Sequence, residues 1–267
     1  MIISLMGAMA FAAGAQAAQT ARTTGWRLQA DPALCVLERR NAEPPVTLSI
    51  ETIPGSDDYR LAIAAPAIKK SAALAPASLT FAPSQKTRNG RARVGKLPDG
   101  TPVMWMENVS PGLLDELSGA ETVTMAIGSR ERVLVQVASS AKAVEALRRC
   151  NADQLLEWGA DAGQFAPGGT APVAVKNREE WLSKGELLKV MGEARRPDVD
   201  ETFRVAVSAD GVVDDCHAVH DKAEKGMEDA ACAPVLGKAL FTPARDAGGH
   251  PVRGVATFRV RLASRPY

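Results

Sequence analysis

FRVAVSADGVVDDC, residues 203–216, is the stretch that decides the fold of the second half of this chain. Its first five residues alternate between apolar and polar or small side chains, starting at Phe203. This alternation is typical of a half-buried strand. Asp210-Gly211 then predicts a tight turn, because glycine accepts the positive φ that a hairpin turn needs. The stretch therefore predicts two antiparallel strands joined by that turn.

A helix and a third strand are expected to complete this unit. Residues 227–240 are rich in alanine and predict a helix. Pro234 should shorten or kink it, because proline has no backbone N–H to donate. In residues 258–262 apolar side chains alternate with arginines, which predicts another amphipathic strand. The order strand, turn, strand, helix, strand describes a small α+β unit.

Five short motifs follow one another along this unit. They are Phe203-x-Val205, Asp210-Gly211-x-Val213, Met227-Glu228-x-Ala230-Ala231, Phe241-x-Pro243-Ala244 and Gly249-x-Pro251-Val252. In this order they resemble the C-terminal domain of TonB, the energy transducer of the Gram-negative periplasm, over about residues 177–263. Cys216 and Cys232 resemble the pair of a cysteine-containing subgroup. The resemblance implies a two-layer domain of helix, β-hairpin, helix and β-strand.

The resemblance also implies a binding mode. Domains of this family hold an extended segment of an outer-membrane receptor by β-augmentation, in which the segment adds a strand to a sheet edge. The matching strand here spans residues 254–262, and its candidate contact residues are Arg253, Val255, Thr257, Arg259 and Arg261. The arginines would meet an acidic peptide. Alternatively, they only solvate an exposed edge and discourage aggregation.

Residues 19–160 predict a β-rich domain that resembles no family we recognise. Eight short apolar runs are separated by turn signals such as Pro54-Gly55 and Asn89-Gly90. The runs are 26–28, 35–37, 46–50, 59–63, 78–81, 102–106, 122–127 and 133–137. This spacing predicts an antiparallel sandwich or barrel. One or two helices are expected with it, at residues 110–117, capped by Ser110, and 141–150, so the chain as a whole is α+β.

The remaining segments predict export and a short spacer. Residues 1–18 are apolar and end in the small-x-small pattern Ala15-Gln16-Ala17, which predicts a secretory signal peptide. The alternative is an uncleaved membrane anchor, although the run is shorter than the ~20 residues that span a bilayer. Residues 161–176, rich in Gly and Pro, predict a linker before the domain at 177–267. We therefore expect a periplasmic protein that contacts a membrane only if residues 1–18 are retained.

Four cysteines in an exported chain predict two disulfides, for which three pairings are possible. Position favours Cys35 with Cys150 and Cys216 with Cys232. The alternative for the second pair is a zinc site completed by His217 and His220. On a strand, however, Cys216 and His220 would share one face and His217 would point to the opposite face.

The sequence gives little support for nucleic-acid binding or for catalysis. A net charge of +1 gives no reason to expect nucleic-acid binding. Nucleophile-elbow and HExxH motifs are absent, and Asp214-Asp215 is expected to be a solvated strand end. We expect no catalytic residue, metal or cofactor.

Our leading hypothesis is a protein that binds a peptide or envelope-protein partner through the TonB-like domain, in connection with TonB-dependent outer-membrane transport. The alternatives are a true energy transducer with an uncleaved anchor, and a secreted enzyme or inhibitor that acts through the β-rich domain. A homodimer formed through edge strands is a further expectation.

Overall fold

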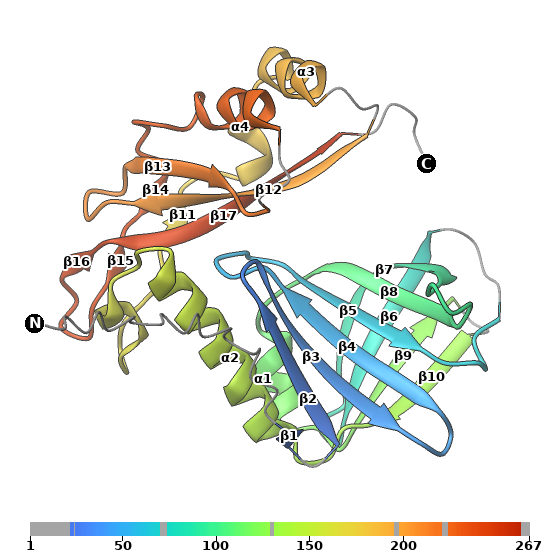
Figure 1. Cartoon of the computed structure of the whole chain (residues 1–267). Helices are drawn as coiled ribbons and strands as arrows, with labels where there is room; N and C mark the ends of the chain where they lie inside the picture. Colours follow the sequence, from blue (N-terminus) through green and yellow to red (C-terminus); the bar gives the residue numbers. More distant parts are fainter. Residues whose placement is uncertain are drawn as a thin grey trace, which may run out of the picture.

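The computed structural model describes residues 22–23, 25–69, 74–128, 131–194, 198–220 and 224–262. The expected signal peptide at residues 1–18 lies outside these ranges. The described chain is of mixed α and β structure, as expected (Figure 1). Its two large hydrophobic clusters belong to successive parts of the chain. We call the part up to Glu157 the first domain and the part from Asp161 onward the second domain.

One ten-stranded antiparallel sheet makes up most of the first domain. Its strands are β1 (Arg22–Thr23), β2 (Trp26–Asp31), β3 (Leu34–Asn41), β4 (Val46–Thr52), β5 (Tyr59–Ala64), β6 (Ala75–Ala82), β7 (Lys86–Lys96), β8 (Pro102–Val109), β9 (Thr122–Ile127) and β10 (Glu131–Gln136). They lie in the order β1-β2-β3-β4-β5-β8-β7-β6-β9-β10. All eight expected runs lie in or at the end of these strands.

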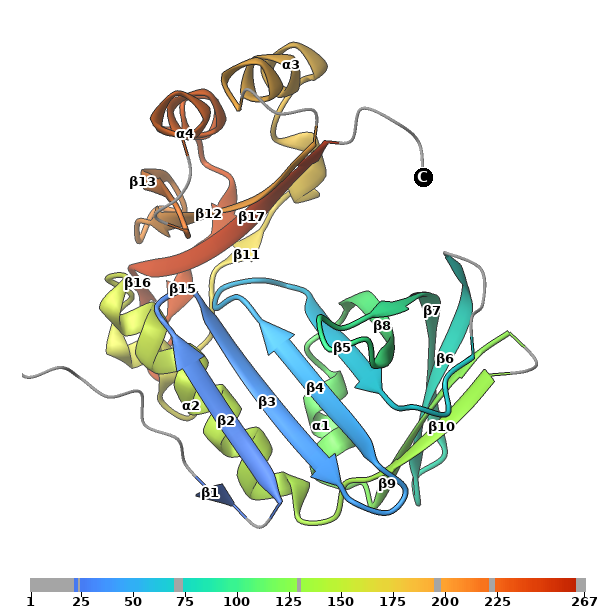
Figure 2. The same ribbon diagram turned by 45° about the vertical axis from the view of Figure 1, so that its right-hand side comes forward.

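The sheet is neither the two-layer sandwich nor the closed barrel that the strand spacing predicts. It is a single strongly curved sheet, with β1 and β10 as its edges among the described strands (Figure 2). The curvature brings its two ends close together, where the indole of Trp26 donates to the carbonyl oxygen of Ala138 and Arg39 donates to that of Gln136. The two ends of the sheet are therefore joined by side chains and not by backbone hydrogen bonds between strands. The regular spacing of strands along a sequence cannot distinguish a curved sheet from a sandwich or a closed barrel.

Strand β7 replaces a turn that the sequence predicts. Asn89 and Gly90 lie inside it and pair with Ser78 and Ala77 of β6. The pattern was misleading because most residues of β7 are charged or polar and show little apolar alternation, although the strand is paired on both sides, with β6 and β8. Neighbouring strands, and not its own side chains, determine that it is extended.

Two helices cover one face of this sheet. Helix α1 spans Leu113–Ser118 and packs against α2, which spans Ser140–Glu157 and lies along β2 and β3. Helix α2 is longer than expected, and α1 begins after Gly112 without the expected cap from Ser110, whose hydroxyl instead accepts from Arg88. The disulfide Cys35–Cys150 fastens α2 to β3.

The second domain places two helices over a three-stranded sheet. Its long elements are α3 (Lys184–Glu193), β12 (Val199–Val207), β13 (Val213–Ala218), α4 (Lys225–Cys232) and β17 (Gly254–Leu262), and the sheet order is β13-β12-β17. The Asp210-Gly211 turn joins β12 to β13 with Gly211 at φ +79°, as predicted. Helix α4 ends before Pro234, and its disulfide Cys216–Cys232 ties it to β13.

The core of this domain consists of apolar side chains between the sheet and the helices. Phe258 stacks on Phe203 at a centroid separation of 5.2 Å, and Trp181 packs against Phe258 and Phe241. Ser183 and Glu186 form a capping box at the start of α3. Asn177 caps the short 3-10 helix η2 (Arg178–Glu180).

The segment expected to be a free linker is folded onto the second domain. It forms the 3-10 helix η1 (Ala162–Phe165) and the strand β11 (Val173–Ala174). Strand β11 pairs with β14 (Phe241–Thr242), and Thr170 bridges to Arg245 in β15 (Ala244–Arg245), which pairs with β16 (Pro251–Val252). Gly and Pro predict loops, but they do not show whether a loop has backbone partners elsewhere in the chain.

Candidate functional site

Strand β17 is an edge strand, and its free side faces the first domain. It pairs with β12 along its whole length and with no second strand in the described part of the chain. Ala256, Phe258 and Val260 point into the core. Successive side chains alternate across a sheet, so Val255 and Thr257 point to the opposite face. There Val255 is buried against Leu155 and Ala160 at the end of α2.

The outward backbone groups of β17 can be assigned from its hydrogen bonds. The Thr257 N–H donates away from β12 to the carbonyl oxygen of Gly55, at 3.0 Å. The Thr257 carbonyl accepts from Nη1 of Arg178. In an antiparallel strand every second residue points its backbone groups to the same side, so Arg259 and Arg261 present theirs outward too. These are the groups that an added strand would bind.

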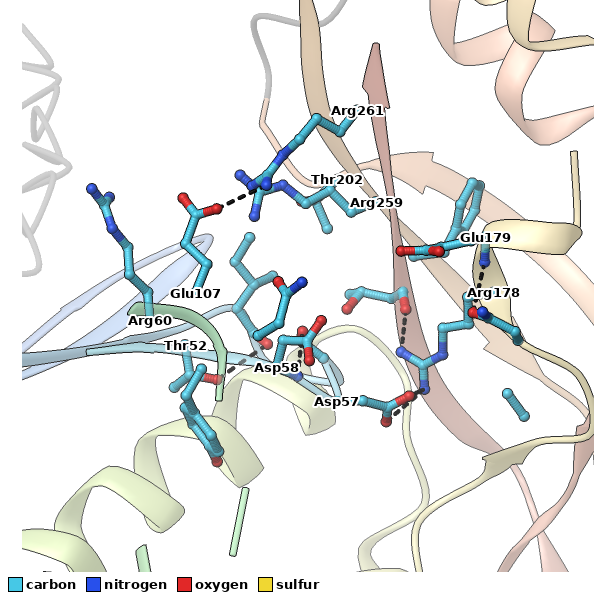
Figure 3. Close-up of a pocket in the computed structure, with 18 of the residues that line it drawn as sticks. Thr52, Asp57, Asp58, Arg60, Glu107, Arg178, Glu179, Thr202, Arg259 and Arg261 are labelled. Atoms are coloured by element: carbon cyan, nitrogen blue, oxygen red, sulfur yellow. Dashed lines mark hydrogen bonds and ion pairs between the residues drawn. The ribbon is translucent and has the colours of Figure 1, made fainter. Parts of the chain in front are cut away.

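Arg178 is the side chain that joins the two domains at this edge. It comes from η2, is only 14% exposed, and donates to Gly55 O (3.3 Å) and to the Asp57 carboxylate (2.8 Å) as well as to Thr257 (Figure 3). Burial lowers the pKa of its guanidinium from the usual value, and the neighbouring carboxylates of Asp57 and Asp58 oppose that shift. The Arg178 guanidinium therefore neutralises the carboxylate of Asp57 in the turn after β4 and donates hydrogen bonds to the carbonyl oxygens of Gly55 and Thr257.

The three arginines expected to meet an acidic peptide are already paired within the chain. Arg253 binds Asp214, Arg259 binds Asp200 through two hydrogen bonds, and Arg261 binds Glu107 of the first domain at 2.8 Å. Each arginine thus faces a carboxylate, and the positive surface that an acidic peptide would need is largely neutralised. The sequence could not reveal this, because each partner comes from another strand.

The space between the domains is a polar cleft of about 980 Å³. Its walls include Asp58, Arg60 and Glu107 from the first domain and Arg259 and Arg261 from β17 (Figure 3). Burial, and next the charge of Asp57, raise the pKa of the Asp58 carboxyl above its usual value. No ion pair involves the Asp58 carboxylate within the described residues. The cleft therefore combines the edge of β17 with a carboxylate, that of Asp58, which forms no ion pair with any described residue.

Sequence reasoning identified the strand but missed the residues that cover it. Gly55 and Asp57 lie in a segment that was predicted only as a turn, and Arg178 lies beside the expected domain boundary. The Pro54-Gly55 dipeptide does signal the turn, but no local pattern indicates that it contacts β17. Of the five expected contact residues, Arg253 to Arg261, the structure leaves the backbone of Arg259 and Arg261 available. Val255 is buried, and Thr257 has both backbone groups occupied.

Comparison with protein-family models, with curated proteins and with solved structures finds no match. The resemblance to the TonB C-terminal domain therefore stays a prediction.

Both disulfides join the cysteines that position favours, Cys35 with Cys150 and Cys216 with Cys232. The alternative of a zinc site at Cys216 is wrong, because both of its sulfur ligands are consumed by the second bridge. His217 lies instead between the carboxylates of Asp215 and Glu228, at 3.0 and 3.4 Å. A search of the described residues finds no group of three His, Cys, Asp or Glu side chains placed to hold a metal.

No helix among the described residues has both the length and the apolar character needed to cross a bilayer.

Proposed function

We propose that this chain is an exported envelope protein, without catalytic activity, whose second domain binds an extended peptide or protein segment by strand addition to β17. The observation that carries the proposal is the free side of β17. There the Thr257 N–H already donates to a backbone carbonyl that lies outside its own sheet. An outward N–H on an edge strand that already donates to one backbone carbonyl can donate in the same manner to a carbonyl of an added strand.

Two further features support the proposal. The order α3, β12, β13, α4 and β17 agrees with the helix, hairpin, helix and strand that the resemblance to TonB implies. Two disulfides favour an oxidising compartment such as the periplasm. The resemblance suggests a segment of an outer-membrane receptor as the partner, which would connect this chain to TonB-dependent transport. Because the arginines of β17 are paired, backbone hydrogen bonds rather than peptide charge would supply most of the affinity.

A proline substitution tests the binding mode directly. The Arg259 N–H points away from β12, so Arg259→Pro removes an outward donor while leaving the ladder to β12 intact. Arg259→Ala is the matched control, because it removes the same ion pair to Asp200 but keeps the N–H. The probe is an array of overlapping 15-residue peptides that tile the envelope proteins of the source organism. Loss of one backbone hydrogen bond predicts about tenfold weaker binding by Arg259→Pro.

Arg259→Ala should bind the same peptides nearly as well as the wild-type chain. Equal binding by Arg259→Pro and Arg259→Ala would rule out strand addition at β17. If no peptide is retained by any form of the chain, the proposed function itself is wrong.

A further inference from the structure

The turn between β4 and β5, residues 53–58, covers the centre of the edge that a peptide would use. Its Gly55 carbonyl accepts from the Thr257 N–H, and its Asp57 carboxylate holds Arg178, which in turn binds the Thr257 carbonyl. Both outward groups of Thr257 are therefore occupied. A strand that adds to β17 needs these two groups, because its hydrogen bonds would recur at every second residue.

Glycine is required for this close approach. Gly55 has φ +78°, and a Cβ at this position would lie 3.0 Å from the Cα of Ala256. A side chain would thus push the turn away from β17, in addition to its strain at positive φ. The backbones of the two domains are in direct contact at this point, which leaves no room for a third chain.

The contacts that keep the turn in place are few and partly solvated. Asp57, which binds Arg178, is 67% exposed. The pair Arg261–Glu107 is 41% and 25% exposed. The apolar part is small, since Val255 packs on Leu155 and Ala160. A cation–π contact accompanies it, in which the guanidinium of Arg204 lies 5.5 Å from the ring of Trp158. Contacts of this kind favour the arrangement in which residues 53–58 lie against β17, but they are weak enough for the two domains to separate.

We propose that the first domain is an intramolecular competitor for the β17 edge, so that a peptide binds fully only after residues 53–58 have left Thr257. The proposal rests on the proposed function, since it concerns regulation of the same edge. The apparent affinity then equals the intrinsic affinity multiplied by the fraction of molecules in which the turn is released. A partner that displaced the first domain would bind more tightly than one that used only Arg259 and Arg261.

The test weakens the interdomain contacts from the first domain alone. The double variant Asp57→Ala/Glu107→Ala removes the carboxylates that hold Arg178 and Arg261, and changes nothing in β17. The matched control is Glu51→Ala. It removes an acid from the same cleft wall, and within the described residues the ion pair of Glu51 is with Arg60 of its own domain. Both variants and the wild-type chain are screened on the tiled 15-residue peptide array described above.

Two measurements are made on each protein. The first is the hydrogen exchange rate of the Thr257 amide. It is compared with the rate of the Phe258 amide, whose N–H points toward β12. The second is the dissociation constant of the best-bound array peptide, by fluorescence anisotropy. In the double variant we expect Thr257 exchange to rise about tenfold with Phe258 unchanged, and the peptide to bind about tenfold more tightly. Glu51→Ala should match the wild type in both.

The outcomes separate the two proposals. Faster Thr257 exchange with unchanged peptide affinity would overturn the competition but leave strand addition intact, as would unchanged exchange in the double variant. Absence of any bound peptide for both the opened and the wild-type chain would overturn the proposed function, and the competition with it.

Discussion

The two disulfides close loops of very different length, and their removal should therefore cost different amounts of stability. Cys35 and Cys150 are 115 residues apart in sequence, whereas Cys216 and Cys232 are 16 apart. In the chain-entropy treatment a bridge stabilises the fold by restricting the unfolded chain. The longer loop is then worth about 5 kcal/mol and the shorter one about 3 kcal/mol. The expected difference is about 2 kcal/mol.

The perturbation is paired alanine substitution, Cys35→Ala/Cys150→Ala compared with Cys216→Ala/Cys232→Ala. Alanine avoids burying an unsatisfied hydroxyl, since Cys35, Cys216 and Cys232 are all buried. The free energy of unfolding is measured by urea titration, followed by tryptophan fluorescence and far-UV circular dichroism. Trp181 reports on the second domain, and Trp26, Trp105 and Trp158 report on the first domain and its end.

The control is the wild-type chain with both bridges reduced, which should be no more stable than the less stable pair variant. Equal losses for the two pairs, or a larger loss for Cys216→Ala/Cys232→Ala, would refute the loop-entropy reasoning. In that case local packing around each bridge, and not restriction of the unfolded chain, would dominate.

Two further predictions concern single residues. Gly211→Ala should lower the free energy of unfolding by at least about 2 kcal/mol, because alanine is strained at positive φ and its Cβ would lie 2.0 Å from the carbonyl oxygen of Phe241. Gly100→Ala is its control in urea titrations, since Gly100 also has positive φ but open space around it, and an equal loss at both glycines would show that the contact with Phe241 is unimportant. The pKa of the Asp58 carboxyl is raised in the folded state, so the folded chain binds this proton more tightly than the unfolded chain does. The free energy of unfolding should therefore fall as the pH rises from near 3.8 through the raised pKa. Asp58→Asn should abolish that decline in thermal unfolding measured across this pH window, and a decline that persists in the variant would mean that other groups cause it.

The individual elements of the second domain could be predicted because they depend on local patterns. Alternation at Phe203–Val207 and Phe258–Leu262 requires a strand with one buried face, and the Asp210-Gly211 turn needs only the conformational freedom of one glycine. The end of α4 before Pro234 follows from a missing backbone donor. The pairing of the four cysteines was favoured by their grouping within the two halves of the chain.

The tertiary structure alone decided what covers the candidate binding edge. Three contacts across the domains join residues that are far apart in sequence: Gly55 with Thr257, Asp57 with Arg178 and Glu107 with Arg261. The sequence around each of these residues does not differ from that of an ordinary exposed segment. The same holds for β7, which is extended because β6 and β8 flank it. Periodicity records which face of an element is buried, but it carries no record of which distant backbone will lie against that element's edge. The docking of the two domains therefore decided which part of β17 stays open.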